Sequence, residues 1–285
     1  MPLHRPPSPR RARNGRLAVD AAADRHRRAA ALLRDQRLAR TPIDPLPADC
    51  RPRDETDGYA VQEALHELLT GAGLGRVAGH KIGCTTPVMQ VYLGIKNPCA
   101  GGVHAATVHD GHARVRHRCY VRVGVECEIA VRLGADLGPG DAPFDRARVA
   151  ASVEAVLAAM EIVDDRYRDY RTLDVPTLIA DDFFNAGCVL GPPITRWRDL
   201  DLPALTGVTR LNGVEVGRGE GRAVMGHPFE ALAWLANLRA RLGLRLRAGE
   251  FVLLGSVVET RWIGFGDEVA VAIEGLGEVR ATFED

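Results

Sequence analysis

The spacing of apolar residues divides the chain into a helical first quarter and a strand-rich remainder. Apolar side chains recur near a 3.6-residue period over residues 17–40 and again over residues 54–70, which predicts two amphipathic helices. Pro42 closely follows the first pattern and Gly71 the second, and both residue types end helices. We therefore expect an N-terminal helical region over residues 17–75.

Short runs of β-branched residues between glycines and prolines predict strands through most of the remaining chain. The expected strands cover residues 77–83, 120–133, 161–163, 187–190, 208–211, 214–216, 251–254, 269–273 and 279–283. Further helices are expected over residues 145–160 and 228–242, with a short helix or turn over residues 87–93. Asn212-Gly213 is the favoured two-residue turn of a β-hairpin. This order predicts an α+β fold with a mostly antiparallel, β-rich domain over residues 76–285.

Residues 1–16 differ from both parts of this pattern. They are basic, contain proline and show no apolar period, so we expect them to form a disordered leader.

Composition narrows the class of protein. The chain has 285 residues, of which 46% are hydrophobic and 26% charged, as is typical of a globular protein, and this length suits one large domain or one domain with a small appendage. The formal net charge of +0 gives no overall field that would attract nucleic acid or an acidic membrane surface. No stretch approaches the roughly 20 apolar residues of a membrane span. We expect neither nucleic acid nor a membrane as a partner.

The six cysteines are scattered and include no C-x-x-C pair, which argues against a zinc knuckle. Since no stretch of the sequence resembles a secretory signal, we expect reduced thiols in a cytoplasmic protein.

Two glutamates in the expected strand over residues 120–133 are the first candidates for chemistry. Glu126 and Glu128 stand two positions apart, so both carboxylates project from the same face of a strand. Close carboxylates repel each other and resist desolvation, and a hard divalent cation offsets both effects. The alternative is a solvated strand face with two surface glutamates.

Glu161 lies within an apolar run, where a carboxylate needs a partner. It fits either a metal site shared with Glu126 and Glu128 or an ion pair with an arginine such as Arg166. Asp164 and Asp165 are nearby acidic competitors for the metal-binding role.

Lys81 is notable because the chain contains only one other lysine, Lys96, and otherwise uses arginine. Its place on a short glycine-bounded strand suggests a need for a compact ammonium group. The alternative is a surface lysine at the end of a strand.

Two further groups have both a functional and an ordinary interpretation. Gly226-His227-Pro228 begins a helix, whose free N–H groups favour an anion such as a substrate carboxylate, but proline is also common at ordinary helix starts. Glu63 and His66, three positions apart on a helix, could form an acid–base pair or lie unused on the surface.

Five motifs resemble a known family when they are taken in order. They are Gly79-His80-Lys81-Ile82-Gly83-Cys84-Thr85, Val125-Glu126-Cys127-Glu128, Ala159-Met160-Glu161-Ile162-Val163, Ile179-Ala180-Asp181-Asp182 and Gly226-His227-Pro228. Together they closely resemble the 2-keto-4-pentenoate hydratase family. That family includes 2-oxohepta-3-ene-1,7-dioate hydratases and 4-oxalocrotonate decarboxylases, within the fumarylacetoacetate hydrolase superfamily. The likeness spans residues 54–283.

This resemblance implies the mixed, mostly antiparallel β-roll of the superfamily and a homo-oligomer. It also implies that Mg2+ or Mn2+ is bound by three carboxylates, and that four residues contact the substrate, Lys81 among them as a catalytic residue. The implied metal ligands are Glu126, Glu128 and Glu161, and the implied substrate contacts are Lys81, Asp181, Gly226 and His227.

The implied reaction is the addition of water to a short 2-hydroxy-2,4-dienoate, giving a 4-hydroxy-2-oxo acid, in the catabolism of aromatic compounds. The chain departs from the family where Asp182-Phe183-Phe184 replaces an Asn-Ala-Ser segment and where Ala106 replaces an acid. Three alternatives therefore remain open: a 4-oxalocrotonate-type decarboxylase, an acylpyruvate hydrolase that uses Glu63 and His66, and a non-catalytic homologue that binds 2-oxo acids.

Overall fold

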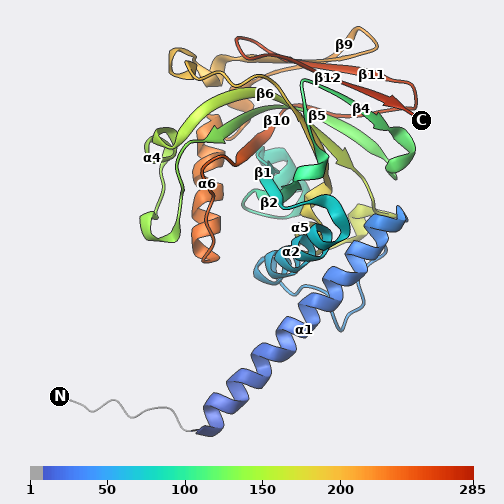
Figure 1. Cartoon of the computed structure of the whole chain (residues 1–285), viewed down its shortest axis with the longest axis vertical. Coiled ribbons are helices and arrows are strands. Elements are labelled where there is room, and N and C mark those ends of the chain that lie inside the picture. The colour runs from blue at the N-terminus through green and yellow to red at the C-terminus, as the bar shows by residue number, and fades with distance from the viewer. Residues whose placement is uncertain (1–8) are drawn as a thin grey trace, which may run out of the picture.

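Within residues 9–285, which the computed structural model describes, twelve strands form two β-sheets (Figure 1). Side chains are described from residue 21 onwards, except at positions 87, 88 and 92. The larger sheet has the strand order β2-β1-β10-β5-β6-β7-β3, and the smaller has the order β4-β12-β11-β8-β9. The strands are β1 (Val77–Gly83), β2 (Cys99–His104), β3 (Val108–Asp110), β4 (His112–Arg116), β5 (Val123–Leu133), β6 (Val153–Asp164), β7 (Asn185–Leu190), β8 (Thr206–Leu211), β9 (Val214–Glu220), β10 (Phe251–Trp262), β11 (Glu268–Ile273) and β12 (Gly277–Glu284).

Most neighbouring strands run antiparallel. The parallel pairs are β1 with β10, β4 with β12, and β3 with β7. Asn212 and Gly213 join β8 to β9 with φ angles of 51° and 82°, as the two-residue turn requires. The predicted mixed, mostly antiparallel α+β architecture is confirmed.

The two sheets pack closely face to face, and small residues make this approach possible. A Cβ atom at Gly207 on β8 would lie 2.5 Å from Val257 on β10 and 2.9 Å from the Cys127 sulfur on β5. Cys127 therefore points toward the smaller sheet. Since side chains alternate along a strand, Glu126 and Glu128 project from the other face of β5.

The helices lie around the larger sheet (Figure 1). α1 packs on α2, α2 packs on α5, and α6 packs against β10. The helices are α1 (Pro9–Ala39), α2 (Glu55–Leu69), α3 (Pro87–Leu93), α4 (Arg146–Ala151), α5 (Val175–Ala180) and α6 (Pro228–Arg241). In the part of the chain that is described, no helix is long and apolar enough to cross a membrane.

The helix predicted over residues 145–160 is wrong. α4 ends at Ala151, and residues 153–164 form β6, which carries Glu161 in the middle of the larger sheet. All residues of β6 except Glu154 are buried. The strand therefore lacks the polar–apolar alternation that identifies half-exposed strands. Its alanines, leucine and methionine also favour helix intrinsically. Tertiary burial overrides that preference here.

Other elements also differ from the prediction, among them β10, which was expected to end at residue 254 and extends to Trp262. α1 begins at Pro9 rather than at residue 17, so its first turns take in part of the predicted leader. Proline suits the first position of a helix, and the arginines that follow are good helix formers. Residues 1–8 of that leader lie outside the described residues. Strands β2, β3 and β4 were not predicted, because glycine and histidine interrupt their β-branched residues.

Candidate active site and metal centre

Three glutamates from two neighbouring strands meet on one face of the larger sheet. In the antiparallel register of β5 and β6, Glu126 is paired directly with Glu161, and Glu128 follows two residues further along β5. Carboxylate oxygens of all three lie within 4.8 Å of one another. The structure thus brings together the three residues that were predicted to bind a metal.

These carboxylates are held by few hydrogen bonds. Glu128 and Glu161 are 0% exposed, and Glu126 is partly buried. The Gly255 N–H donates to Glu128 Oε2 over 2.8 Å, the Asn185 side-chain amide donates to Glu161 Oε1 over 3.0 Å, and the Thr260 hydroxyl donates to Glu126.

Two buried oxygens of the cluster have no hydrogen-bond partner within the described structure, namely Glu128 Oε1 and Glu161 Oε2. A buried, unpartnered carboxylate oxygen is costly unless a cation neutralises it. Oxygen donors are also the ligands that hard divalent cations prefer. The residues present therefore fit a divalent metal ion.

Lys81 faces this cluster from β1. Its ammonium nitrogen lies 3.2 Å from Glu161 Oε1 and donates to the Phe183 carbonyl over 3.0 Å. The side chain is 3% exposed, so it is not the surface lysine of the alternative interpretation. Burial lowers the pKa of Lys81, but attraction to the three glutamates outweighs it, and the pKa rises above its ordinary value.

The same electrostatics act on the carboxylates in the opposite sense. Burial, together with repulsion from Glu161 and Glu126, raises the pKa of Glu128 well above its usual range. Burial also raises the pKa of Glu161, although attraction to Lys81 opposes the rise. One lysine does not balance three close carboxylates, and further positive charge would stabilise the group.

A cavity of about 500 Å³ opens beside the cluster. Lys81 and Glu126 form part of its wall and so connect the cavity to the carboxylates behind them. Phe183 and Phe184 form another part. The arrangement can accept an anionic small molecule next to an ammonium group and three carboxylates that fit a metal ion.

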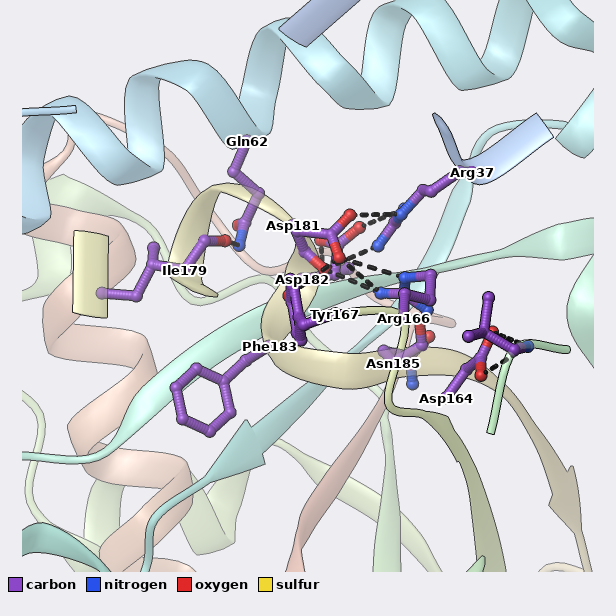
Figure 2. Close-up of polar contacts among 12 residues, drawn as sticks. Arg37, Gln62, Asp164, Arg166, Tyr167, Ile179, Asp181, Asp182, Phe183 and Asn185 are labelled. Atoms are coloured by element: carbon purple, nitrogen blue, oxygen red, sulfur yellow. Dashed lines mark hydrogen bonds and ion pairs between the residues drawn. The ribbon is translucent and has the colours of Figure 1, made fainter. Parts of the chain in front are cut away.

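Asp181 lies outside this cavity and makes a structural ion pair instead (Figure 2). Its carboxylate is bonded by Arg37 Nε at 2.5 Å, Arg166 Nε at 3.0 Å and the Tyr167 hydroxyl at 2.8 Å. These partners use both of its oxygens, and the residue is fully buried. Its predicted contact with substrate finds no support in this position.

The segment after Asp181 has a strained backbone. Asp182, Phe183 and Phe184 have φ angles of 57°, 47° and 70°, a region that residues other than glycine rarely adopt. The Asp182 carboxylate holds the segment by accepting from the Gly102 N–H, His66 and Arg37. We call Arg37, Asp181, Asp182 and His66 the aspartate clamp.

The clamp also accounts for the second group of metal-ligand residue types, which comprises His66, His104 and Asp182. Arg37 lies 3.0 Å from Asp182 Oδ2 and balances its charge without a metal. Attraction to His66 and Arg37 outweighs burial and holds the pKa of Asp182 well below its ordinary value.

The remaining predicted residues are not brought to the cavity. His227 is the N-cap of α6, where its Nδ1 accepts from the Phe229 N–H over 3.0 Å, and Gly226 before it is exposed. Glu63 pairs with Arg239 at 2.6 Å, while His66 is buried against Asp182. Neither the helix start nor the Glu63 and His66 pair lines the cavity beside the three glutamates.

Sequence reasoning missed Asn185, Thr260 and the Phe183 carbonyl as partners of the charged cluster. Asn185 offered a weak signal, because an amide at the start of a buried strand needs a partner. The Phe183 carbonyl offered none, since its direction depends on the unusual backbone of its segment.

Comparison with known proteins adds independent observations. The family model described as fumarylacetoacetate (FAA) hydrolase C-terminal matches residues 93–284. A 2-keto-4-pentenoate hydratase from Paraburkholderia phymatum is 36% identical over 256 residues, which cover 90% of this chain and 96% of that protein. A 4-oxalocrotonate decarboxylase from Pseudomonas putida is 32% identical over 229 residues, covering 80% of this chain and 84% of that protein.

Among solved structures, the 4-oxalocrotonate decarboxylase of Pseudomonas putida G7, complexed with magnesium and adipate, has a similar fold. The TM-score is 0.84 at 27% sequence identity, and the match covers 91% of this chain and 97% of that chain.

Proposed function

The chain belongs to the fumarylacetoacetate hydrolase family, and from that premise we propose that it is a metal-dependent hydratase of 2-hydroxy-2,4-dienoates. The reaction adds water to the dienoate and gives a 4-hydroxy-2-oxo acid, which makes the enzyme a hydro-lyase. The similarity to named hydratases over nine-tenths of the chain supports this choice. The chemistry fits a step in the catabolism of aromatic compounds, in a cytoplasmic enzyme.

One observation carries the proposal: two fully buried carboxylates each keep an oxygen without a partner, beside a third carboxylate that reaches a cavity. A surface acidic patch does not need such an arrangement, whereas a metal site does. We propose Glu126, Glu128 and Glu161 as the ligands and Mg2+ or Mn2+ as the ion. When bound, such an ion stabilises negative charge on oxygen, here the charge that develops on the C2 oxygen of the substrate.

The chain's own residues then have separate tasks. Lys81 presents an ammonium group to the cavity wall, where it can pair with the substrate carboxylate. Asn185, the Gly255 N–H and Thr260 fix the orientation of the three carboxylates through the hydrogen bonds described above. Protonation of the dienoate at C5 and addition of water at C4 complete the reaction, so that substrate plus one water equals product.

The direct test is product analysis. We expect the purified protein with Mg2+ or Mn2+ to convert 2-hydroxypenta-2,4-dienoate into 4-hydroxy-2-oxopentanoate. The loss of dienoate absorbance measures the rate, and NMR identifies the product. Failure to form this product with either ion, from this substrate or its longer homologues, would contradict the proposal.

A second candidate is decarboxylation of a 4-oxalocrotonate-type acid, which the fold similarity to a decarboxylase supports. It is distinguished by release of CO2 from 4-oxalocrotonate. We expect no release above the uncatalysed rate.

We also propose that the protein is a homo-oligomer, in line with the resemblance of its motifs to the hydratase family. Light scattering should then give a mass that is a multiple of 30.9 kDa, and a monomer mass would contradict this part of the proposal.

A further inference from the structure

Away from Lys81 and Glu126, the wall of the cavity is mostly apolar. The other described side chains that shape it include six large apolar ones, namely Met89, Leu93, Phe183, Phe184, Val258 and Trp262. Such a wall favours an apolar ligand surface, because burying apolar area against it releases water.

The aromatic part of this wall is rigidly built. The Phe184 ring packs edge-on against Phe183, Tyr167 and Tyr170 with centroid distances of 5.5, 5.1 and 5.6 Å. The aspartate clamp fixes the strained backbone that places these rings, and Figure 2 shows the Phe183 ring pointing away from the clamp. The wall is therefore a fixed feature of the site, because a strained backbone persists only when its surroundings hold it.

Positive charge is scarce along the described wall. Lys81 is the one cation among the described lining residues. It already forms an ion pair with Glu161 and a hydrogen bond to the Phe183 carbonyl. Arg122 stacks over the ring of the lining residue Trp262 at 4.0 Å, but it pairs with Asp165 at 3.3 Å and is not among the described lining residues. A second carboxylate on the ligand would lack a charged partner.

The hydroxyl groups of the wall carry no charge, and two of them already donate hydrogen bonds within the protein. Thr260 donates to Glu126, and Ser256 donates to the backbone carbonyl of Val258 over 2.5 Å. Glu259, an exposed residue of the wall, adds negative charge. A buried carboxylate without a cation is strongly disfavoured.

The size of the cavity also exceeds the needs of a five-carbon acid. Its volume of about 500 Å³ lies within the range of pockets that enclose drug-sized ligands.

We propose that the substrate is a mono-carboxylate 2-hydroxy-2,4-dienoate with an uncharged apolar group, alkyl or aryl, beyond C5. The dienoate part rests on the proposed function, whereas the apolar end rests on the cavity wall. Dicarboxylates of the 4-oxalocrotonate type are disfavoured by the same wall.

Binding of unreactive 2-oxo acids tests this specificity without turnover. Calorimetry with Mg2+ present would compare 2-oxopentanoate, 2-oxohexanoate, 2-oxooctanoate and 2-oxoadipate. We expect affinity to rise about four-fold for each buried methylene. 2-Oxoadipate should bind at least about ten-fold more weakly than 2-oxohexanoate, which has the same length but no second carboxylate. Equal binding of these two acids, or no gain from 2-oxopentanoate to 2-oxooctanoate, would overturn the inference.

A matched pair of variants sharpens the test. Met89 lines the cavity and is 42% exposed, so the protein should tolerate substitution there. Met89→Arg adds a cation to the wall and should shift the preference toward 2-oxoadipate by about ten-fold, whereas Met89→Leu should keep the wild-type order. If the expected order of binding holds but no dienoate is hydrated, the proposed function fails and the apolar specificity stands. If none of the acids binds, both fail.

Discussion

At the scale of single residues, the main feature of the site is negative charge on buried carboxylates that too few positive groups balance. Glu128 and Glu161 are fully buried and each retains an oxygen without a hydrogen bond in the described structure, while Lys81 places an ammonium group 3.2 Å from Glu161. These residue types were recognisable from the sequence, because two glutamates on one strand face and a rare lysine are unusual features. Their partners were harder to recognise: Asn185 gave only a weak signal and the Gly255 N–H none, because both reach the cluster through strand pairing.

Lys81 offers a sharp test at this scale. We expect Lys81→Met to lower kcat/KM for the dienoate by at least about 100-fold, because the cavity loses the ammonium group that we propose pairs with the substrate carboxylate. Lys81→Arg should not restore activity, since the buried site holds a compact ammonium between Glu161 and the Phe183 carbonyl, and a larger, planar guanidinium does not reproduce that geometry. Steady-state kinetics measure both effects.

The only other lysine provides the control. Lys96 is exposed, so Lys96→Met should retain wild-type kinetics. Lys81→Met protein with kcat/KM within a few-fold of wild type would show that Lys81 does not contact the substrate.

At the scale of elements, the site depends on how α1, α2 and the strained segment hold one another. Arg37 on α1 reaches Asp181 and Asp182, and His66 on α2 reaches Asp182 from another side. Removing one partner of a buried ion pair leaves an uncompensated charge, which costs far more than the loss of a surface pair. Helices α1 and α2 thereby hold the segment that carries Phe183 and Phe184, although neither helix lines the cavity itself.

Two arginines on the same helix test this dependence. Arg37→Met should lower the free energy of unfolding by about 3 kcal/mol, because the buried Asp182 loses its arginine. Arg34 pairs with the exposed Asp35, so Arg34→Met should cost less than about 1 kcal/mol. Urea unfolding at constant Mg2+ concentration compares the two, and equal losses would contradict the clamp.

Helices and strands with one buried and one exposed face were predicted well, whereas strands buried on both faces were not. α2 and the β8–β9 hairpin fall close to the expected residues, since their periods and turn residues are clear. β6 was mistaken for a helix over most of its length, because alanine-rich strands buried on both faces show no alternation. Glu161 was found despite this error, from its position within an apolar run.

At the scale of the whole molecule, the fold could be anticipated better than the details of the cavity. Motif order and strand content predicted a mixed, mostly antiparallel β architecture, which the structure has. The clamp joins Arg37 to residues 144 and 145 positions later in the chain, and no local pattern encodes such contacts. This is why Asp181 was assigned to substrate binding rather than to its ion pair.

Metal binding should stabilise the whole protein, because three close carboxylates repel one another without it. At a free Mg2+ concentration of 100 times Kd, we expect the free energy of unfolding to rise by about 2.7 kcal/mol. For a chain of this size, that corresponds to an increase in Tm of roughly 5–10 °C. Thermal unfolding of chelator-treated protein with and without added Mg2+ measures the shift. An unchanged Tm at saturating Mg2+ and Mn2+ would argue against a metal site.

The central claim is that three glutamates, two of them fully buried, hold the ion on which dienoate hydration depends. The most direct measurement is the hydration rate of chelator-treated protein as a function of added Mg2+ or Mn2+, in wild type, Glu161→Gln and Glu154→Gln. Glu154 is an exposed residue of the same strand and serves as the control. We predict that wild type and Glu154→Gln recover full activity with metal, while folded Glu161→Gln stays at least about 100-fold lower. Metal-independent hydration by the wild type, or wild-type rates in Glu161→Gln, would contradict the account.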